Sequence, residues 1–141
     1  MEKFKKLNFG TAGVPITSPS RNLIEGIPHV KRLGLDSLEL EFVQQVYVKT
    51  EQTKEIKKIS EDNEVYLTCH GQYYINLNSK EPEKLVASQK RIYQAAKIAD
   101  MCGAKFLTFH AGFYLGQDKE EVYKKIRDAL EEVKEKLDSE D

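Results

Sequence analysis

Two histidines stand at matching places in two similar segments of the chain. His70 closes the run Tyr-Leu-Thr-Cys-His, and His110 closes the run Phe-Leu-Thr-Phe-His 40 residues later. In each segment a small residue follows the histidine. A period of this length, with one apolar run and one helical run per repeat, is typical of a strand-helix unit used twice. Two imidazoles on neighbouring strand ends can both bind one zinc ion, so metal binding is the first chemistry that these residues indicate.

The alternation of side chains in each run predicts the face that carries the histidine. Side chains at positions i, i+2 and i+4 of a strand share one face. His70 is therefore expected on the same face as Thr68 and Tyr66, whereas Cys69 points to the opposite side. The run that ends at His110 divides in the same way. Both imidazoles should project from a semi-polar face, which leaves the aliphatic face to pack on helices.

A third strand-like run carries carboxylates on the equivalent face. In residues 38–42, Leu-Glu-Leu-Glu-Phe, Glu39 and Glu41 alternate with apolar residues. Glu41 has the parity to complete a His-His-Glu set with His70 and His110. A catalytic zinc usually keeps three protein ligands and a water that ionises near neutral pH. The alternative is structural: the imidazoles are hydrogen-bonded interior groups, and the carboxylates pair with Lys or Arg.

Composition bounds the class of protein. The chain has 141 residues, of which 40% are hydrophobic and 32% charged, and residues 1–141 are expected to form a single domain. The net charge of −1 gives no overall basic field, so any affinity for nucleic acid has to come from a local patch. Without a long apolar run or a leader, we expect a cytoplasmic protein with no membrane span. Cys69 and Cys102 are expected to be reduced interior residues.

Four strands alternating with four helices must position these side chains. A helical stretch is predicted from residues 18–20 to about Leu33. Pro28 interrupts it, so its regular part is expected to begin there, and Gly34 is expected to end it. The segment 73–77 is apolar and aromatic and is predicted to be an ordered loop. The predicted strands are residues 7–11, 37–42, 65–70 and 105–110, and the predicted helices are residues 28–33, 50 or 53 to 63, 82–102 and 118–137.

This alternation predicts a parallel sheet with right-handed crossovers. Such a sheet needs cover on both faces, yet one face here carries Glu, Thr and His side chains. The interior of a barrel near its catalytic rim fits that face better than a second layer of helices. A complete barrel needs eight such units in about 250 residues. The predicted fold class is therefore α/β: a (βα)4 half of a TIM barrel, with a parallel sheet and helices on the outer face.

The runs His-Gly-Gln-Tyr-Tyr-Ile-Asn-Leu from His70 and Phe-His-Ala-Gly around His110 resemble the two early signatures of the endonuclease IV family. These are AP endonucleases, DNA-repair hydrolases within the xylose isomerase-like TIM barrels, and the resemblance spans roughly residues 7–135. It implies a zinc cluster that cleaves the phosphodiester 5′ of an abasic site. It also implies that His70 and His110 are ligands of one zinc, and that Tyr73 enters the DNA near the lesion. Residues 10–12, Gly-Thr-Ala, replace the Gly-Ala-His of that family, and its C-terminal metal ligands lie on strands beyond the four predicted here.

Three functions stay open at this point. The first is an endonuclease IV-like phosphodiesterase that is incomplete in this chain, with zinc or another divalent metal as cofactor and abasic DNA as partner. The second is a metal-dependent sugar isomerase or epimerase of the same superfamily, in which Glu41 assists proton transfer. The third is a non-catalytic half-barrel whose open sheet docks a second copy or a missing C-terminal half, because a half-barrel leaves two sheet edges and a partly apolar face uncovered. Tyr73 has a packing alternative to DNA contact.

Overall fold

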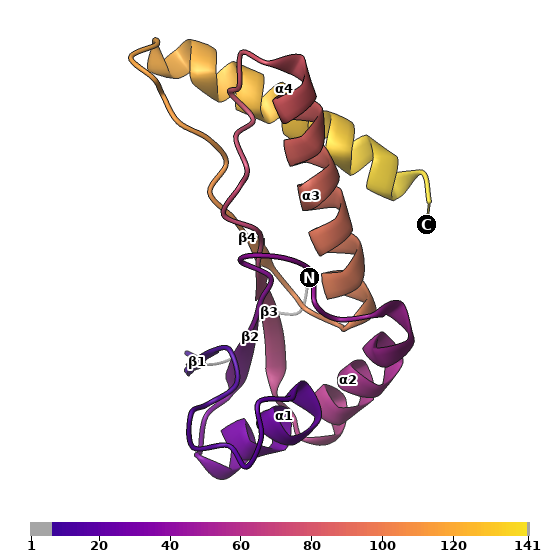
Figure 1. The fold of residues 1–141 in the computed structure, drawn as a ribbon. Coiled ribbons are helices and arrows are strands. Elements are labelled where there is room, and N and C mark those ends of the chain that lie inside the picture. The colour runs from indigo at the N-terminus through magenta and orange to yellow at the C-terminus, as the bar shows by residue number, and fades with distance from the viewer. Residues whose placement is uncertain (1–6, 141) are drawn as a thin grey trace.

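The computed structural model describes residues 7–140. A strand and a helix alternate four times, and every strand pairing is parallel in the order β1-β2-β3-β4 (Figure 1). This arrangement confirms the prediction of an α/β half-barrel. The strands are β1 (Gly10–Ala12), β2 (Ser37–Glu41), β3 (Tyr66–His70) and β4 (Leu107–Thr108), and the helices are α1 (Leu23–Arg32), α2 (Thr50–Asp62), α3 (Pro82–Met101) and α4 (Lys119–Asp138).

The two faces of the sheet differ as the alternation predicts. Glu41 pairs in register with His70, and His70 with Thr108, so these side chains share one face. On that face the rings of Tyr66 and Phe106 are exposed. The opposite face lies against the helices and is buried; its residues include Leu38, Leu40, Phe42, Leu67 and Cys69. Helices therefore cover one side of the sheet, and the side that carries the histidines stays open.

Helix α1 lies within the predicted helical stretch, but its regular part begins at Leu23 and not at Pro28. The side chain of Asn22 accepts a hydrogen bond from the Glu25 amide at 2.8 Å, which fixes the first turn at Leu23. Pro28 lies inside the helix, where its missing amide removes one backbone hydrogen bond without ending the element. The prediction that the helix starts at Pro28 was therefore wrong. The predicted stop was correct, because Gly34 has a φ of 75° just after the helix.

The two outer strands are shorter than predicted. Strand β1 starts at Gly10 instead of residue 7, and β4 ends at Thr108, two residues before His110. Each of these strands has a neighbour on one side among the described residues, whereas β2 and β3 have neighbours on both. With half the cross-strand hydrogen bonds, an edge strand keeps regular geometry over fewer residues.

The core consists of two clusters. The first fills the space between the sheet and helices α1 to α3. The second joins α3 and α4 to the loop after β3, where Ile75 and Leu77 are almost fully buried. The segment that contains them is not part of a helix or strand, as predicted, and its apolar residues anchor it to the helices.

Helix α4 matches its predicted range closely and is amphipathic. Asp118 caps it by accepting hydrogen bonds from the amides of Glu120 and Glu121. Val122, Ala129 and Val133 are buried, and much of the remaining surface is charged. Between residues 7 and 140, no helix has the length and apolar content that crossing a membrane requires.

The two thiols are expected to be unreactive in the folded protein. Cys69 and Cys102 are free and buried. Burial is the main cause that raises the pKa of Cys69 to about 12, with the nearby Glu39 adding to it, and burial raises the pKa of Cys102 to about 11. Since the thiolate is the reactive form, modification by a disulfide reagent at pH 8 should be at least ~100-fold slower in native buffer than in urea. Fast labelling of either thiol in the native chain would contradict this expectation.

Candidate functional site

The two histidine rings lie side by side at the carboxyl ends of β3 and β4. His70 is the last residue of β3, and His110 follows β4 by two residues. Their ring centroids are 5.5 Å apart, with the planes tilted by 51°. His70 is half-buried and His110 is exposed. The sheet therefore brings together the two imidazoles that the sequence repeat singled out.

A backbone hydrogen bond orients the His70 ring. Its Nδ1 lies 2.7 Å from the carbonyl oxygen of Gly71. A carbonyl oxygen only accepts, so Nδ1 carries the proton and, in the neutral ring, Nε2 keeps its lone pair. Histidines that bind metals typically donate their second N–H to a carbonyl or carboxylate, which fixes the tautomer and the ring direction. The His70 ring is thus held in the orientation of a histidine that binds a metal through Nε2.

Tyr73 lies against both imidazoles. Its ring centroid is 5.7 Å from that of His70 and 6.3 Å from that of His110. The Tyr73 amide donates to the Val43 carbonyl at 2.9 Å, which anchors the residue to the loop after β2. The side chain is nevertheless 55% exposed. A fixed backbone with a solvent-exposed ring leaves Tyr73 able to contact a bound molecule beside the histidines.

Glu41 lies next to the histidines in the sheet but is directed toward the end of β1. Glu41 pairs in register with His70. Its Oε2 atom lies 3.0 Å from the position that a Cβ at Gly13 would occupy, and Gly13 has a φ of 74°. Within residues 7–140, no three His, Cys, Asp or Glu side chains are grouped closely enough to hold a metal ion.

This donor set fits part of a zinc site. Two imidazole nitrogens match the preference of zinc for nitrogen ligands, but a catalytic zinc usually has three protein ligands. The described residues bring the two histidines together, and Glu41 as the third ligand stays a prediction.

Tyr47 holds the end of β2, a role that the sequence did not indicate. Its ring meets that of Phe42 edge to face, with centroids 5.4 Å apart. Tyr47 is 46% exposed, and its partial burial is the main cause that raises its pKa to about 12. Electrostatic interactions with Cys69 and Glu41 add to the rise, while a hydrogen bond with the Glu41 backbone opposes it. The hydroxyl therefore stays protonated at neutral pH and supports the strand that carries Glu41.

Two asparagines, also missed, tie the histidine-bearing loops together. Asn78 is buried and donates from Nδ2 to the carbonyl of Phe113 at 2.8 Å. The backbone amide of Asn78 donates to Asn76 Oδ1 at 3.1 Å. A Cβ at Gly112 would lie only 2.9 Å from Asn76 Oδ1, so this close approach requires glycine. The only signal in the sequence was the presence of polar residues inside an apolar loop.

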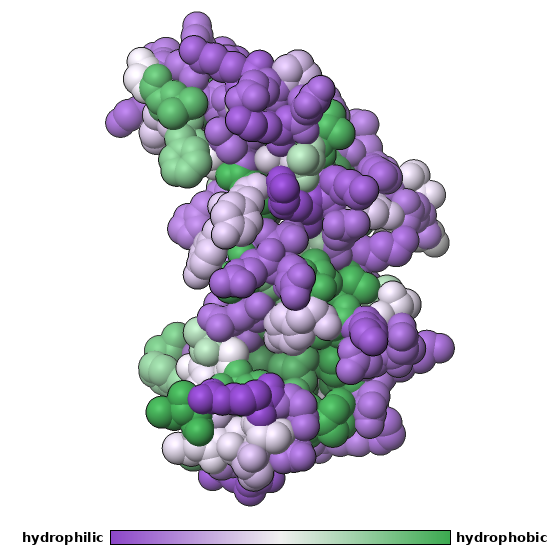
Figure 2. All heavy atoms as spheres, viewed as in Figure 1, coloured by the Kyte–Doolittle hydropathy of each residue, from purple (hydrophilic) through white to green (hydrophobic). Residues whose placement is uncertain are grey.

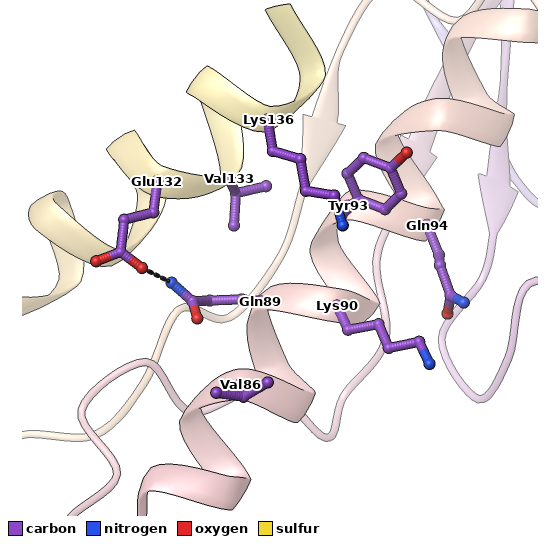
Figure 3. A pocket seen from close by; sticks show the side chains of 8 residues that line it. All are labelled: Val86, Gln89, Lys90, Tyr93, Gln94, Glu132, Val133 and Lys136. Carbon is purple, nitrogen blue, oxygen red and sulfur yellow. Dashed lines mark hydrogen bonds between the residues drawn. The ribbon is translucent and has the colours of Figure 1, made fainter. Parts of the chain in front are cut away.

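A separate pocket of ≈ 480 Å³ lies between α3 and α4 (Figure 3). Gln89 spans it by donating to Glu132 at 2.7 Å, and Lys136 Nζ lies 4.3 Å from the centre of the Tyr93 ring. Neither histidine lines this pocket, and its residues are those of a polar helix-helix contact. The candidate site at the strand ends is therefore distinct from this pocket. The lining residues are Val86, Gln89, Lys90, Tyr93, Gln94, Glu132, Val133 and Lys136.

The parallel half-barrel and the polar strand ends define a class of protein. The chain belongs to the xylose isomerase-like TIM barrel family, whose sequence profile matches residues 27–141. It is 39% identical over 133 residues to an uncharacterized protein of Methanocaldococcus jannaschii, a match that covers 94% of this chain and 47% of that protein. It is also 36% identical to a probable endonuclease 4 of Chlorobium limicola over 52 residues, which are 37% of this chain and 18% of that protein. The chain thus spans about half the length of the archaeal relative.

Solved structures share the fold. D-psicose 3-epimerase of Clostridium cellulolyticum superposes with a TM-score of 0.65 at 18% identity, over 82% of this chain and 43% of that enzyme. Endonuclease IV of Thermus thermophilus superposes with a TM-score of 0.61 at 15% identity, over 79% of this chain and 42% of that enzyme. At these identities the likeness concerns the fold alone, and in both cases this chain corresponds to less than half of the barrel enzyme.

Proposed function

We propose that this chain forms the N-terminal half of an endonuclease IV-like site for zinc-dependent phosphodiester hydrolysis at abasic sites in DNA repair. The observation that carries the proposal is the placement of His70 and His110 side by side at neighbouring strand ends, with Tyr73 against both rings. The partial sequence match to a probable endonuclease 4 supports it. In this proposal, the ligands that this chain does not supply come from the strands that complete the barrel.

Each residue has a distinct role in this proposal. A divalent metal bound here would supply an activated water and a positive charge for the phosphate oxygens. His70, oriented by the Gly71 carbonyl, offers Nε2 as one ligand, and His110 offers a second from the next strand. Tyr73 stacks on, or inserts beside, the nucleotide next to the lesion.

The loop between β4 and α4 extends the proposed DNA surface. Phe113 and Tyr114 are 61% and 55% exposed. The Lys119 ammonium lies 5.8 Å from the centre of the Tyr114 ring. Exposed aromatic rings and a nearby cation suit unstacked bases and a phosphate backbone. A local patch of this kind supplies the affinity that a net charge of −1 does not.

A sugar isomerase or epimerase is the second candidate. It is favoured by Glu41, which is in register with His70 on the open face and offers a carboxylate for proton transfer. The epimerase among the structures of similar fold is compatible with it. A half-barrel without catalytic activity is the third candidate.

A DNA-binding assay and an activity assay separate these candidates. The chain, supplied with zinc, is incubated with a duplex that contains one abasic site and with the same duplex undamaged. Because the chain supplies only part of the proposed ligand set, we expect tighter binding of the abasic duplex than of the undamaged one, weakened in His70→Ala and kept in His29→Ala. His29 is a fitting control because its Nε2 lies 2.8 Å from Thr17 Oγ1 in the α1 region, outside the site.

The second assay follows the conversion of a panel of ketohexoses by the same variants. Turnover that requires Glu41, without a preference for the abasic duplex, would favour the epimerase. If the chain neither prefers the abasic duplex nor converts a ketohexose, the non-catalytic half-barrel is favoured and the phosphodiesterase proposal fails for this chain.

A further inference from the structure

An apolar groove of ≈ 560 Å³ runs along the helix side of β4. Leu107 and Phe109, around β4, form its floor, and Ile126, Leu130 and Leu137 of α4 form its wall. Strand β4 is one end of the sheet, and within the described residues no strand continues beyond it. The groove therefore lies where the next strand of a barrel would place its outward side chains.

The opposite edge of the sheet, at β1, carries apolar residues that could fill such a groove. Leu7 and Phe9 precede β1 as alternate residues. The Phe9 carbonyl accepts from the Ser37 amide at 3.1 Å, so Phe9 continues the β1–β2 pairing, in which Thr11 is in register with the buried Leu38. Leu7 is 75% exposed and Phe9 is 62% exposed. Figure 2 shows apolar residues (green) at the surface in the lower left, the region where Figure 1 places β1. Among the described residues, two large apolar side chains are thus exposed beside the β1 edge of the sheet.

We propose that β1 of a second copy pairs with β4 and that its Leu7 and Phe9 fill the groove under α4. We call this contact between β1 of one copy and β4 of the other the joint. A twofold axis forms the joint twice and closes a ring of eight parallel strands, the number that a TIM barrel requires. The occupant is a second copy because this chain carries both halves of the joint at opposite edges. The joint removes both open edges and encloses the face that carries Tyr66 and Phe106.

The assembly would also change the candidate site. Each copy contributes His70, His110 and Glu41 to one rim, so ligands that a single chain lacks are supplied by its partner. The joint itself depends on apolar contacts and strand pairing. It can therefore be tested independently of zinc binding and nuclease activity.

The native mass of the full chain tests the association. Light scattering at micromolar concentration is expected to give twice the chain mass of 16.2 kDa. Phe9→Lys places a charge in the groove and is expected to give a monomer with an unchanged circular dichroism spectrum. Val86→Lys is the matched control, because Val86 is an equally exposed apolar residue on α3 outside the groove, and it should remain dimeric.

A cross-link tests the geometry. Phe9→Cys and Ile126→Cys chains are mixed and oxidised, and a disulfide-linked pair is expected, while the buried Cys69 and Cys102 do not compete. Each variant oxidised alone should give little of this product. A monomeric wild-type chain, a dimeric Phe9→Lys chain, or a mixed dimer without the cross-link would each overturn the proposal.

Discussion

Replacing His70 by alanine is expected to abolish stoichiometric zinc uptake by this chain. The variant loses the one imidazole whose Nδ1 is fixed by a backbone carbonyl and whose Nε2 is therefore presented for coordination. Changes that disturb only a hydrogen bond behind a ligand already weaken metal binding by about 10–100-fold, so loss of the ligand itself should exceed that. Equilibrium dialysis against zinc, with the bound metal measured per chain, gives the stoichiometry and the affinity.

Two further variants make this measurement specific. His110→Ala should show a similar loss, because its ring lies 5.5 Å from that of His70. His29→Ala removes a histidine that contacts Thr17 and should bind zinc as the wild type does. If His70→Ala binds zinc with the same stoichiometry and affinity as wild type, His70 is not a ligand.

The largest effect on stability is expected for Phe42→Ala. Phe42 follows β2, is fully buried on the helix side of the sheet, and meets the Tyr47 ring edge to face. Truncating a buried phenylalanine removes apolar contacts and leaves a cavity, which typically lowers the free energy of unfolding by about 3–5 kcal/mol. Urea unfolding followed by circular dichroism measures the change.

The control is the same substitution at an exposed phenylalanine. Phe113 is 61% exposed, and Phe113→Ala should change the free energy of unfolding by no more than about 0.5 kcal/mol. All variants are compared at one chain concentration, since the proposed self-association would add a concentration-dependent contribution. Equal effects at Phe42 and Phe113 would contradict the proposed role of Phe42 in the core.

The faces of the strands were predictable because alternation in a strand is a local geometric rule. It placed Leu38 and Leu40 against the helices and Glu41 on the open face, as the structure shows. The ends of the outer strands were less predictable, since they depend on hydrogen bonds with a neighbour that the local sequence does not specify. Helix α1 shows the same limit: the cap by Asn22 outweighs the interruption expected at Pro28.

For the candidate site, the sequence predicted which residues meet at the sheet edge but not how every side chain is directed. The pairing of His70 with His110 follows from two similar runs ending at the same edge of a parallel sheet. The direction of the Glu41 carboxylate depends on the close approach of Gly13 from another strand end, which no local pattern reveals. The contact between Asn78 and Phe113 joins residues 35 positions apart, so it too could be found only in three dimensions.

The amide link between the two rim loops bears on how the site meets a ligand. Separating the segments that carry His70 and His110 would break the bond from Asn78 to the Phe113 carbonyl, at an asparagine that is only 2% exposed. Leaving a buried amide unpaired costs about 1–3 kcal/mol, so the two segments are expected to behave as one rigid platform. An incoming cation or phosphate then finds its contacts already in place, and little conformational entropy is lost when it binds.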